Sequence, residues 1–280
     1  MKRRNTRGAM YFSVPAWEPR AELAHGFFGR SGGSSPPPYA SLNVGSRGGD
    51  EPANVSLNLE RIARALSVPK ERIFCASQVH GDEILRVSAP RGSIFGPGEP
   101  VRADGLITAE RDLYLGVLTA DCVPLLLFDP RRSVVGAVHA GWRGTVQGIA
   151  HRAVRSMQQT FDCNAADIRV AIGPAVGPCC YVVGEEVVRA CLEIDPSTRP
   201  FLDPASEGRW KMNLSAINLH QLIATGIGRK NVTSFPLCTC CAKDLFFSVR
   251  AGGDPTGRQL SLIGLRPERA EGWDRGLTAY

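Results

Sequence analysis

Residues 114–139 read YLGVLTADCVPLLLFDPRRSVVGAVH, and this stretch decides the fold. It contains three apolar runs of strand length, which cover 114–119, 123–128 and 134–139. Ala120-Asp121 separates the first two runs, and the turn residues Asp129-Pro130-Arg131 separate the last two. Runs this apolar are typical of strands that are covered on both faces. We therefore predict three buried strands here, in a domain that mixes helices with sheets.

The sequence on either side predicts further helices and strands. Helical spacing of apolar residues predicts a helix that opens at Asp50-Glu51-Pro52, a long helix after Gly141-Trp142-Arg143-Gly144, and helices at 184–193 and 214–226. Further strands are predicted at 73–79, 83–87, 168–172, 231–235, 245–250 and 259–265. Because there is no repeat and no linker, we expect a single domain over 21–280, preceded by a poorly ordered arm at 1–20.

The composition excludes several classes of protein. Of the 280 residues, 43% are hydrophobic and 21% are charged, which excludes a disordered or fibrous chain. The most apolar stretch, 115–128, is interrupted by Asp121 and Pro124, so no run reaches the ~18 apolar residues of a membrane span. No apolar segment follows the basic start at 1–4, so we expect a cytoplasmic protein without membrane partners. The formal charge of +6 comes mostly from scattered arginines, which argues against nucleic-acid binding.

The nine cysteines indicate reduced thiols rather than a disulfide framework, because their number is odd and no secretion signal precedes them. Cys238-Thr239-Cys240-Cys241 contains a C-x-x-C spacing, and Cys179-Cys180 could complete a four-thiolate metal site. Against such a site, there is no second C-x-x-C, and adjacent cysteines do not easily ligate one ion. We expect thiols that mostly serve packing.

Three residues at the ends of strands suit a metal site. His80 and His139 each end an apolar run and precede glycine or Ala140-Gly141, which let backbone or ligand approach closely. Cys122 lies at the break between two buried strands, and a short turn joins its strand to that of His139. Two imidazoles and a thiolate make a zinc set that leaves a fourth position for water or substrate. The alternative is a core thiol with hydrogen-bonded packing histidines, since no local metal motif is present.

Phosphate binding would have to use arginines or the N-terminus of a helix, because no P-loop or dinucleotide-binding motif occurs. Gly141-Trp142-Arg143-Gly144, just before the predicted long helix, offers both. The alternative is a plain tight turn with Arg143 in solvent.

Several multi-residue segments follow one another in a characteristic order. They are ASLNVG at 40–45, GD at 49–50, QVHG at 78–81, ADG at 103–105, TADCVP at 119–124, HAGWRG at 139–144, IGPAVGP at 172–178, CT at 238–239 and FFSVR at 246–250. In these segments, over roughly 23–265, the chain resembles the YfiH family. Its members were long labelled multicopper polyphenol oxidases or laccase-domain proteins and are now described as purine nucleoside phosphorylases with adenosine deaminase activity.

The resemblance implies a zinc site formed by His80, Cys122 and His139, the same residues that the strand ends indicate. It implies an α+β fold in which two mixed sheets lie between helices, a four-layer α/β/β/α sandwich. It also implies a cytoplasmic and largely monomeric enzyme. That enzyme would convert adenosine, inosine or methylthioadenosine and phosphate to the free base and ribose 1-phosphate, with deamination of adenosine as a side activity.

For such an enzyme, the residues that we expect to bind the substrates carry guanidinium or amide groups. The candidates for phosphate are Arg47, Arg143 and Arg250, with Asn43 as a polar neighbour. Asp121, beside Cys122, is a candidate to orient a ligand or to act as a base. The alternative is that Asp121 only caps the break between two strands.

Two other activities would use the same residues. A laccase-like polyphenol oxidase would take copper in place of zinc, but multicopper sites need more imidazoles than two well-placed histidines supply. A cysteine amidase, such as a peptidoglycan-precursor editing enzyme, would use Cys122 as nucleophile and His139 as base. A metal distinguishes them, because a thiolate that binds zinc does not easily attack a carbonyl.

Overall fold

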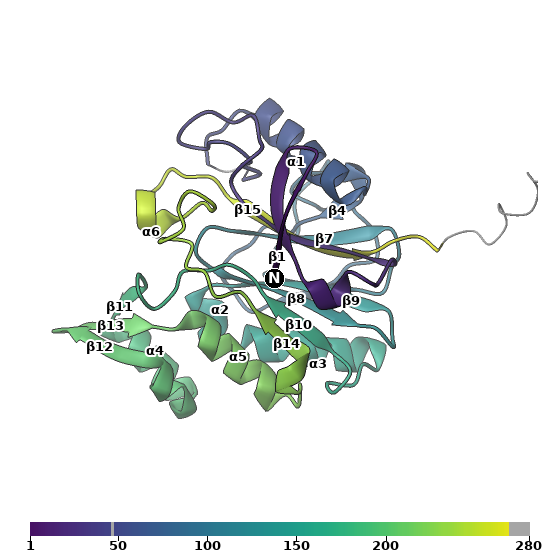
Figure 1. Ribbon diagram of the computed structural model, residues 1–280. Helices are drawn as coiled ribbons and strands as arrows, with labels where there is room; N and C mark the ends of the chain where they lie inside the picture. Colours follow the sequence, from purple (N-terminus) through teal and green to yellow (C-terminus); the bar gives the residue numbers. More distant parts are fainter. Residues whose placement is uncertain (46–47, 269–280) are drawn as a thin grey trace, which may run out of the picture.

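The chain passes from one β-sheet to another at Ala120-Asp121-Cys122, and this passage sets the architecture. In the computed structural model, which describes residues 1–45 and 48–268, β7 (Leu113–Thr119) lies in one six-stranded sheet (Figure 1). The next two strands, β8 (Val123–Asp129) and β9 (Val134–Ala140), lie in another. The three buried strands predicted from residues 114–139 are confirmed.

The first sheet has the strand order β1-β2-β3-β15-β7-β4. Its strands are antiparallel, except that β4 runs parallel to β7. The other bounds are β1 Lys2–Thr6, β2 Ala9–Ser13, β3 Leu23–Phe28, β4 Ile73–Phe74 and β15 Gln259–Leu265. Because β15 pairs with both β3 and β7, distant parts of the sequence meet at the centre of this sheet.

The second sheet has the strand order β14-β10-β8-β9-β6-β5. Its two edge strands run parallel to their neighbours, and the four central strands are antiparallel. The other bounds are β5 Ile84–Arg86, β6 Gly105–Thr108, β10 Arg169–Ile172 and β14 Val232–Ser234. A third sheet, β11-β13-β12, is small and antiparallel, with β11 at Val182–Gly184, β12 at Leu202–Ser206 and β13 at Arg209–Met212.

Side chains that alternate along the strands produce three apolar layers. In β8, Leu126 and Phe128 pack in the layer between the two large sheets, whereas Leu125 and Leu127 belong to the layer on the opposite face. That outer layer is covered by the helices α3 (Ile149–Phe161) and α5 (Leu214–Ala224), and α1 (Pro52–Leu66) covers the far face of the first sheet. Figure 1 shows α1 above the sheets and α3 and α5 below them. The predicted four-layer α/β/β/α sandwich in a single domain is confirmed.

The remaining helices are short or lie at the margin of the sandwich. They are α2 (Trp142–Val146), α4 (Glu185–Ile194) and α6 (Val249–Gly252), together with the 3-10 turns η1 (Pro15–Trp17), η2 (Lys70–Arg72), η3 (Pro196–Phe201) and η4 (Arg229–Asn231). In the described parts of the chain, no helix combines the length and the apolar character that crossing a membrane requires.

The prediction of a poorly ordered arm at 1–20 is wrong. β1 and β2 form a hairpin that extends the first sheet beyond β3. Phe12 is buried between the two large sheets, and Trp17 packs against the rings of His25 and Phe128. The short apolar and aromatic run at 9–14, AMYFSV, is the strand signal that the prediction overlooked. Of the domain expected over 21–280, residues 269–280 lie outside the described residues.

Three element predictions are also wrong in detail. The long helix after residue 144 is divided into α2 and α3, because Gly148 adopts a left-handed φ of 79°. The strand predicted at 245–250 is a turn followed by α6, and the Ser248 hydroxyl caps this helix by accepting from the Ala251 N–H. The strand predicted at 73–79 ends after Phe74, because the chain leaves the sheet to form the loop that carries His80.

We predict that Leu126→Ala lowers the free energy of unfolding by about 3 kcal/mol, because it opens a cavity between the two large sheets. Leu126 is fully buried there, whereas Leu57 on α1 is 48% exposed. Urea unfolding followed by circular dichroism measures both variants, and Leu57→Ala should change the stability by less than about 0.5 kcal/mol. Equal effects of the two substitutions would contradict the layer assignment.

Candidate active site

Cys122 and His139 come together through the pairing of β8 with β9. The two strands are antiparallel, with Val123 opposite Ala140 and Pro124 opposite His139. Cys122, which directly precedes β8, therefore lies beside His139 at one end of the strand pair. The proximity predicted from the short turn between these strands is confirmed.

His80 reaches the same point on a loop that follows β4. Gln78 fixes this loop to β7, because its amide donates to the Leu118 carbonyl at 2.8 Å and accepts from the Leu118 N–H at 2.7 Å. The backbone of His80 is left-handed, with a φ of 59°, which is uncommon for a residue other than glycine. A loop held in this way presents the imidazole in one fixed position.

His80, Cys122 and His139 form one cluster of donor atoms. One ligating atom from each residue lies within 4.8 Å of the other two. The two imidazole rings are 4.8 Å apart between centroids, with an angle of 77° between their planes. His80 is exposed, Cys122 is half-buried and His139 is buried, so the cluster opens to solvent on the His80 side.

A buried carboxylate, Asp104, holds both histidines of the cluster. Its Oδ1 accepts a hydrogen bond from His139 Nδ1 at 2.7 Å and one from the His80 N–H at 3.0 Å. Its Oδ2 accepts from the N–H groups of Val79 and Gly81 at 3.0 and 2.8 Å. With Nδ1 of His139 directed at Asp104, the other ring nitrogen is the one available to a ligand.

This role of Asp104 was not predicted from the sequence, where the residue stands out only as part of the segment 103–105. The available signal was an isolated acidic residue directly before the apolar strand β6. Nothing in its spacing from His80 or His139 shows that all three side chains meet, because the connection depends on the pairing of β6 with β9.

The cluster changes the pKa values of its members. Burial by itself would raise the pKa of Cys122, but the positive charge of His139 and hydrogen bonds from both imidazoles outweigh it and lower that pKa to about 6. Burial would likewise lower the pKa of His139, yet the Cys122 thiolate and the hydrogen bond to Asp104 raise it to about 9. At neutral pH the metal-free cluster therefore contains a thiolate, the form of cysteine that binds metals and reacts as a nucleophile.

Two glycines leave the space that the cluster requires. A Cβ atom at Gly141 would lie 2.8 Å from His80 Nδ1 and 3.4 Å from Cys122 Sγ. A Cβ atom at Gly144 would lie 2.5 Å from the carbonyl oxygen of Gly81. The segment HAGWRG can approach the donor atoms and the His80 loop this closely only because neither position carries a side chain.

The cluster lies in a cavity of about 610 Å³, a volume typical of sites for small molecules. Apolar surface comes from Ile94, Leu118 and Tyr181, and positive charge comes from Arg250 and Arg258. The sequence analysis did not single out Tyr181 or Arg258, because neither belongs to a motif with a recognisable chemical role.

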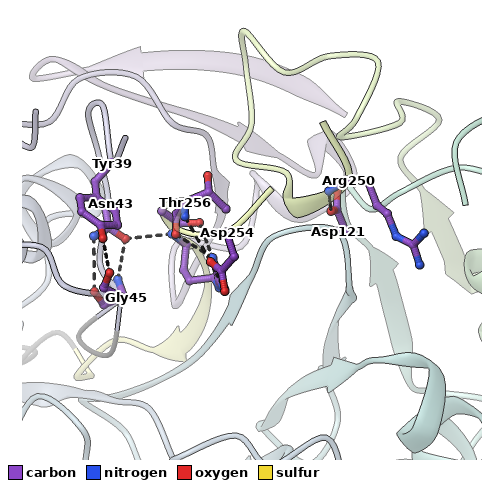
Figure 2. Close-up of polar contacts among 10 residues, drawn as sticks. Tyr39, Asn43, Gly45, Asp121, Arg250, Asp254 and Thr256 are labelled. Carbon is purple, nitrogen blue, oxygen red and sulfur yellow. Dashed lines mark hydrogen bonds and ion pairs between the residues drawn. The ribbon is translucent and has the colours of Figure 1, made fainter. Parts of the chain in front are cut away.

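Asp121 lines this cavity, but its carboxylate is already engaged. Oδ1 accepts from the Thr239 hydroxyl at 2.7 Å, and Oδ2 accepts from the backbone N–H of Arg250 at 2.8 Å. Figure 2 shows Asp121 beside the backbone of Arg250, whose guanidinium extends away from it. These contacts join the segments that carry Thr239 and Arg250 to the link between the two large sheets, next to Cys122. They favour a positioning role over that of a base.

Asn43 is buried and organises a loop next to the cavity. Its Oδ1 accepts from the N–H groups of Gly45 and Arg258, each at 2.8 Å, and its Nδ2 donates to Asp50 at 2.8 Å. In Figure 2 these contacts lie near Thr256 and Asp254 and apart from Asp121. The amide group is thus used within the protein, and it places Arg258 rather than facing the cavity itself.

The three arginines predicted to bind phosphate have different positions. Arg250 lines the cavity, with its guanidinium 4.9 Å from the ring of Tyr181. Arg143 is exposed on α2, lies 4.4 Å from the ring of Trp142 and does not line the cavity. Arg47 lies outside the described residues.

The other three histidines lie away from the cluster. His25 is buried and accepts a hydrogen bond from the Val14 N–H at 2.9 Å, and burial lowers its pKa to about 4. His151 and His220 line a separate cavity on the α3 and α5 side. Within the described residues, the cluster therefore offers two imidazoles and one thiolate.

Comparison with known proteins gives a consistent result. Residues 24–266 match the family model described as multi-copper polyphenol oxidoreductase laccase. The chain is 40% identical over 262 residues to a protein of Geobacillus stearothermophilus named purine nucleoside phosphorylase YlmD, in a match that covers 89% of this chain and 93% of that protein.

Solved structures agree with this match. The crystal structure of the Bacillus licheniformis hypothetical protein YfiH is similar with a TM-score of 0.88 and 34% identity, covering 94% of this chain and 99% of that one. The crystal structure of YlmD from Geobacillus stearothermophilus gives a TM-score of 0.85 and 36% identity, covering 94% and 98%. Fold, segment order and identity together show that the chain belongs to the YfiH family, whose model is described as multi-copper polyphenol oxidoreductase laccase.

Proposed function

We propose that this protein is a zinc-dependent purine nucleoside phosphorylase. A phosphate oxygen forms a bond to C1′ of the nucleoside while the bond from C1′ to the purine nitrogen breaks. The base leaves with the electron pair and takes up a proton, and the sugar is released as its 1-phosphate, which is ribose 1-phosphate from adenosine or inosine and 5-methylthioribose 1-phosphate from methylthioadenosine. Adenosine, inosine and methylthioadenosine are the proposed substrates. Relatives of 32–43% identity that are named purine nucleoside phosphorylases support the activity.

The observation that carries the proposal is that one cavity is lined both by a cluster of metal-ligating side chains and by two arginines. His80, Cys122 and His139 lie on its wall together with Arg250 and Arg258. Phosphorolysis needs a cationic site for phosphate and a polarising group for the other substrate, and guanidinium groups bind phosphate in a bidentate manner. Ile94, Leu118 and Tyr181 supply apolar surface on which a purine can pack.

The donor set fits zinc. Two imidazoles and a thiolate lie within 4.8 Å of one another, and the missing side chain at Gly141 keeps the space between them open. When bound, zinc would supply a Lewis acid that polarises a purine or a water molecule. Asp104 is a positioning residue: it fixes the ring of His139 and the loop of His80 before any ion arrives.

The phosphate would be bound by Arg258 and Arg250. Arg258 is placed by Asn43 and by its own bonds to the carbonyls of Thr256 and Gly257, at 2.7 and 3.1 Å. Asp254 lies 3.5 Å from its guanidinium and is the group with which phosphate would compete. Arg250 is held through its backbone N–H by Asp121, and its guanidinium lies over Tyr181 and donates to the Val182 carbonyl at 3.1 Å.

Deamination of adenosine is the proposed side activity. A water oxygen bonds to the purine C6, and the amino group leaves as ammonia. A zinc set of imidazole and thiolate ligands supports this proposal, because nucleobase deaminases use such sets. Phosphate takes no part in this reaction.

Two other functions are less well supported. A multicopper oxidase needs more imidazoles than the two that this cluster offers within the described residues. Copper at the same cluster would give at most weak oxidation of phenols. The thiolate of metal-free Cys122 would also suit a cysteine amidase, and the requirement for zinc separates that activity from phosphorolysis.

We predict that the zinc-loaded protein releases free base, adenine plus hypoxanthine, and ribose 1-phosphate in equal amounts from adenosine, and only when phosphate is present. Cys122→Ser should lower kcat/KM by about 100-fold or more, because a hydroxyl is a much weaker zinc ligand than a thiolate. Coupled assays for free base and ribose 1-phosphate measure this. Cys191→Ala, which removes a buried thiol of α4, is the matched control. Bound zinc without release of base would contradict the proposal.

We predict that Arg258→Gln raises the KM for phosphate by about 10-fold or more and leaves the rate of deamination within twofold of the wild type. The reason is that a charge-assisted bond contributes about 1.5–3 kcal/mol and that only phosphorolysis uses phosphate. Parallel assays of adenine and ammonia give both rates. Arg189→Gln, on the exposed face of α4, is the control. A larger effect of Arg143→Gln would place the phosphate at α2 instead.

A further inference from the structure

Four cysteines outside the catalytic cluster converge on one point. They are Cys179, Cys180, Cys238 and Cys241, which we call the thiol quartet. All four Sγ atoms lie within 4.8 Å of one another. Cys240, within the same stretch of chain, does not belong to this group.

The fold builds the thiol quartet from two turns that are joined side by side. In the first, Gly177 accepts bonds from the N–H groups of Cys180 and Tyr181, each at 3.0 Å. In the second, Cys238 accepts from the N–H of Ala242 at 2.9 Å. A β-bridge pairs Ala175 with Cys238 and fixes the two turns against each other. The convergence of the sulfur atoms is therefore a property of the backbone.

The distances between the sulfur atoms suit a tetrahedral zinc ion. Cys241 Sγ lies 3.6 Å from Cys179 Sγ and 3.4 Å from Cys180 Sγ. Four ligands at a zinc–sulfur distance of ~2.3 Å lie ~3.8 Å from one another at the corners of a tetrahedron. A disulfide would instead bring each bonded pair of sulfur atoms to ~2.05 Å. One sulfur that contacts two others at similar distances favours a shared ion over a particular pair.

The environment of Cys238 also suits a thiolate. The backbone N–H of Gly177 donates to Cys238 Sγ at 3.1 Å. A Cβ atom at Gly177 would lie 3.2 Å from Cys238 Cβ and 3.4 Å from Cys179 Sγ, so glycine permits the close approach that this bond requires. N–H donors of this kind stabilise the charged form of a ligand, which metal binding requires.

We infer that the thiol quartet binds one zinc ion as a structural site, separate from the catalytic cluster. The sequence analysis argued against it because adjacent cysteines do not easily ligate one ion. The turn at 177–181 removes that objection, since it directs both Cys179 and Cys180 toward Cys241.

An ion at the thiol quartet would stiffen one wall of the active-site cavity. Tyr181 follows Cys180 directly and lines the cavity. Thr239 follows Cys238 and donates its hydroxyl proton to Asp121, the neighbour of Cys122. The ion would thus connect two segments that shape the cavity, and the ion itself would not touch the substrate. This inference does not depend on the reaction proposed for the cavity.

Titration of the metal-free, reduced protein with Co²⁺ tests the inference. Cobalt that is bound by four thiolates gives intense charge-transfer absorption, and we expect this absorption in the wild type. It should persist in Cys122→Ser, which disables the catalytic cluster, and in the matched control Cys240→Ser. It should be lost in Cys179→Ser/Cys241→Ser, whose two changed thiols are exposed and whose folding circular dichroism verifies. Release of zinc to a chromophoric chelator should show one ion fewer per chain in this double variant.

Two results would overturn the inference. One is absorption that disappears in Cys122→Ser but survives in Cys179→Ser/Cys241→Ser, because the metal would then occupy only the catalytic cluster. The other is metal-free wild type in which mass spectrometry under non-reducing conditions finds the quartet thiols joined as disulfides. Either result leaves the test of phosphorolysis unaffected.

Discussion

The carboxylate of Asp104 is the group on which the candidate active site depends. It is 1% exposed, and burying a charge is unfavourable unless hydrogen bonds compensate it. Burial would raise its pKa, but the bond and the charge of His139 and the N–H groups of the His80 loop outweigh burial and lower it. One buried charge thus orients the imidazole of His139 and holds the left-handed backbone of His80. Without it, the two imidazoles would have no common support.

The fold brings the other components to that carboxylate. The chain changes sheets at residues 120–122, and this passage places Cys122 at the edge between the two large sheets, beside His139 on β9. Asp121, beside Cys122, accepts hydrogen bonds from the Thr239 hydroxyl and the backbone N–H of Arg250 and so joins two distant segments at this point. A four-layer sandwich provides rigid support for these loops, because its central strands are buried on both faces.

The sequence predicted the three central strands and the donor cluster well, but it did not predict the hydrogen bonds that hold the cluster in place. The apolar runs at 114–139 identify three central strands, and the positions of His80, Cys122 and His139 at strand ends led to the cluster that the structure brings together. The role of Asp104 was beyond sequence reasoning, because it depends on which strands become neighbours. Asn43 illustrates the reverse error. Its side chain was predicted to lie near the bound phosphate, but in the structure it forms hydrogen bonds to Asp50 and to the backbone of Arg258. The hairpin at the N-terminus was missed because β1 is polar and basic, and only the short apolar run of β2 indicates a strand there.

The most direct measurement of the central claim is the zinc affinity of Asp104→Asn, determined by competition with a chromophoric chelator. Asparagine keeps the shape of the side chain but removes its charge and one of its acceptor atoms, so we expect zinc at the cluster to bind about 10- to 100-fold more weakly. Asp129→Asn, which changes another fully buried carboxylate that accepts backbone N–H bonds, should bind zinc like the wild type. A folded Asp104→Asn protein with unchanged affinity would show that the cluster does not depend on this carboxylate.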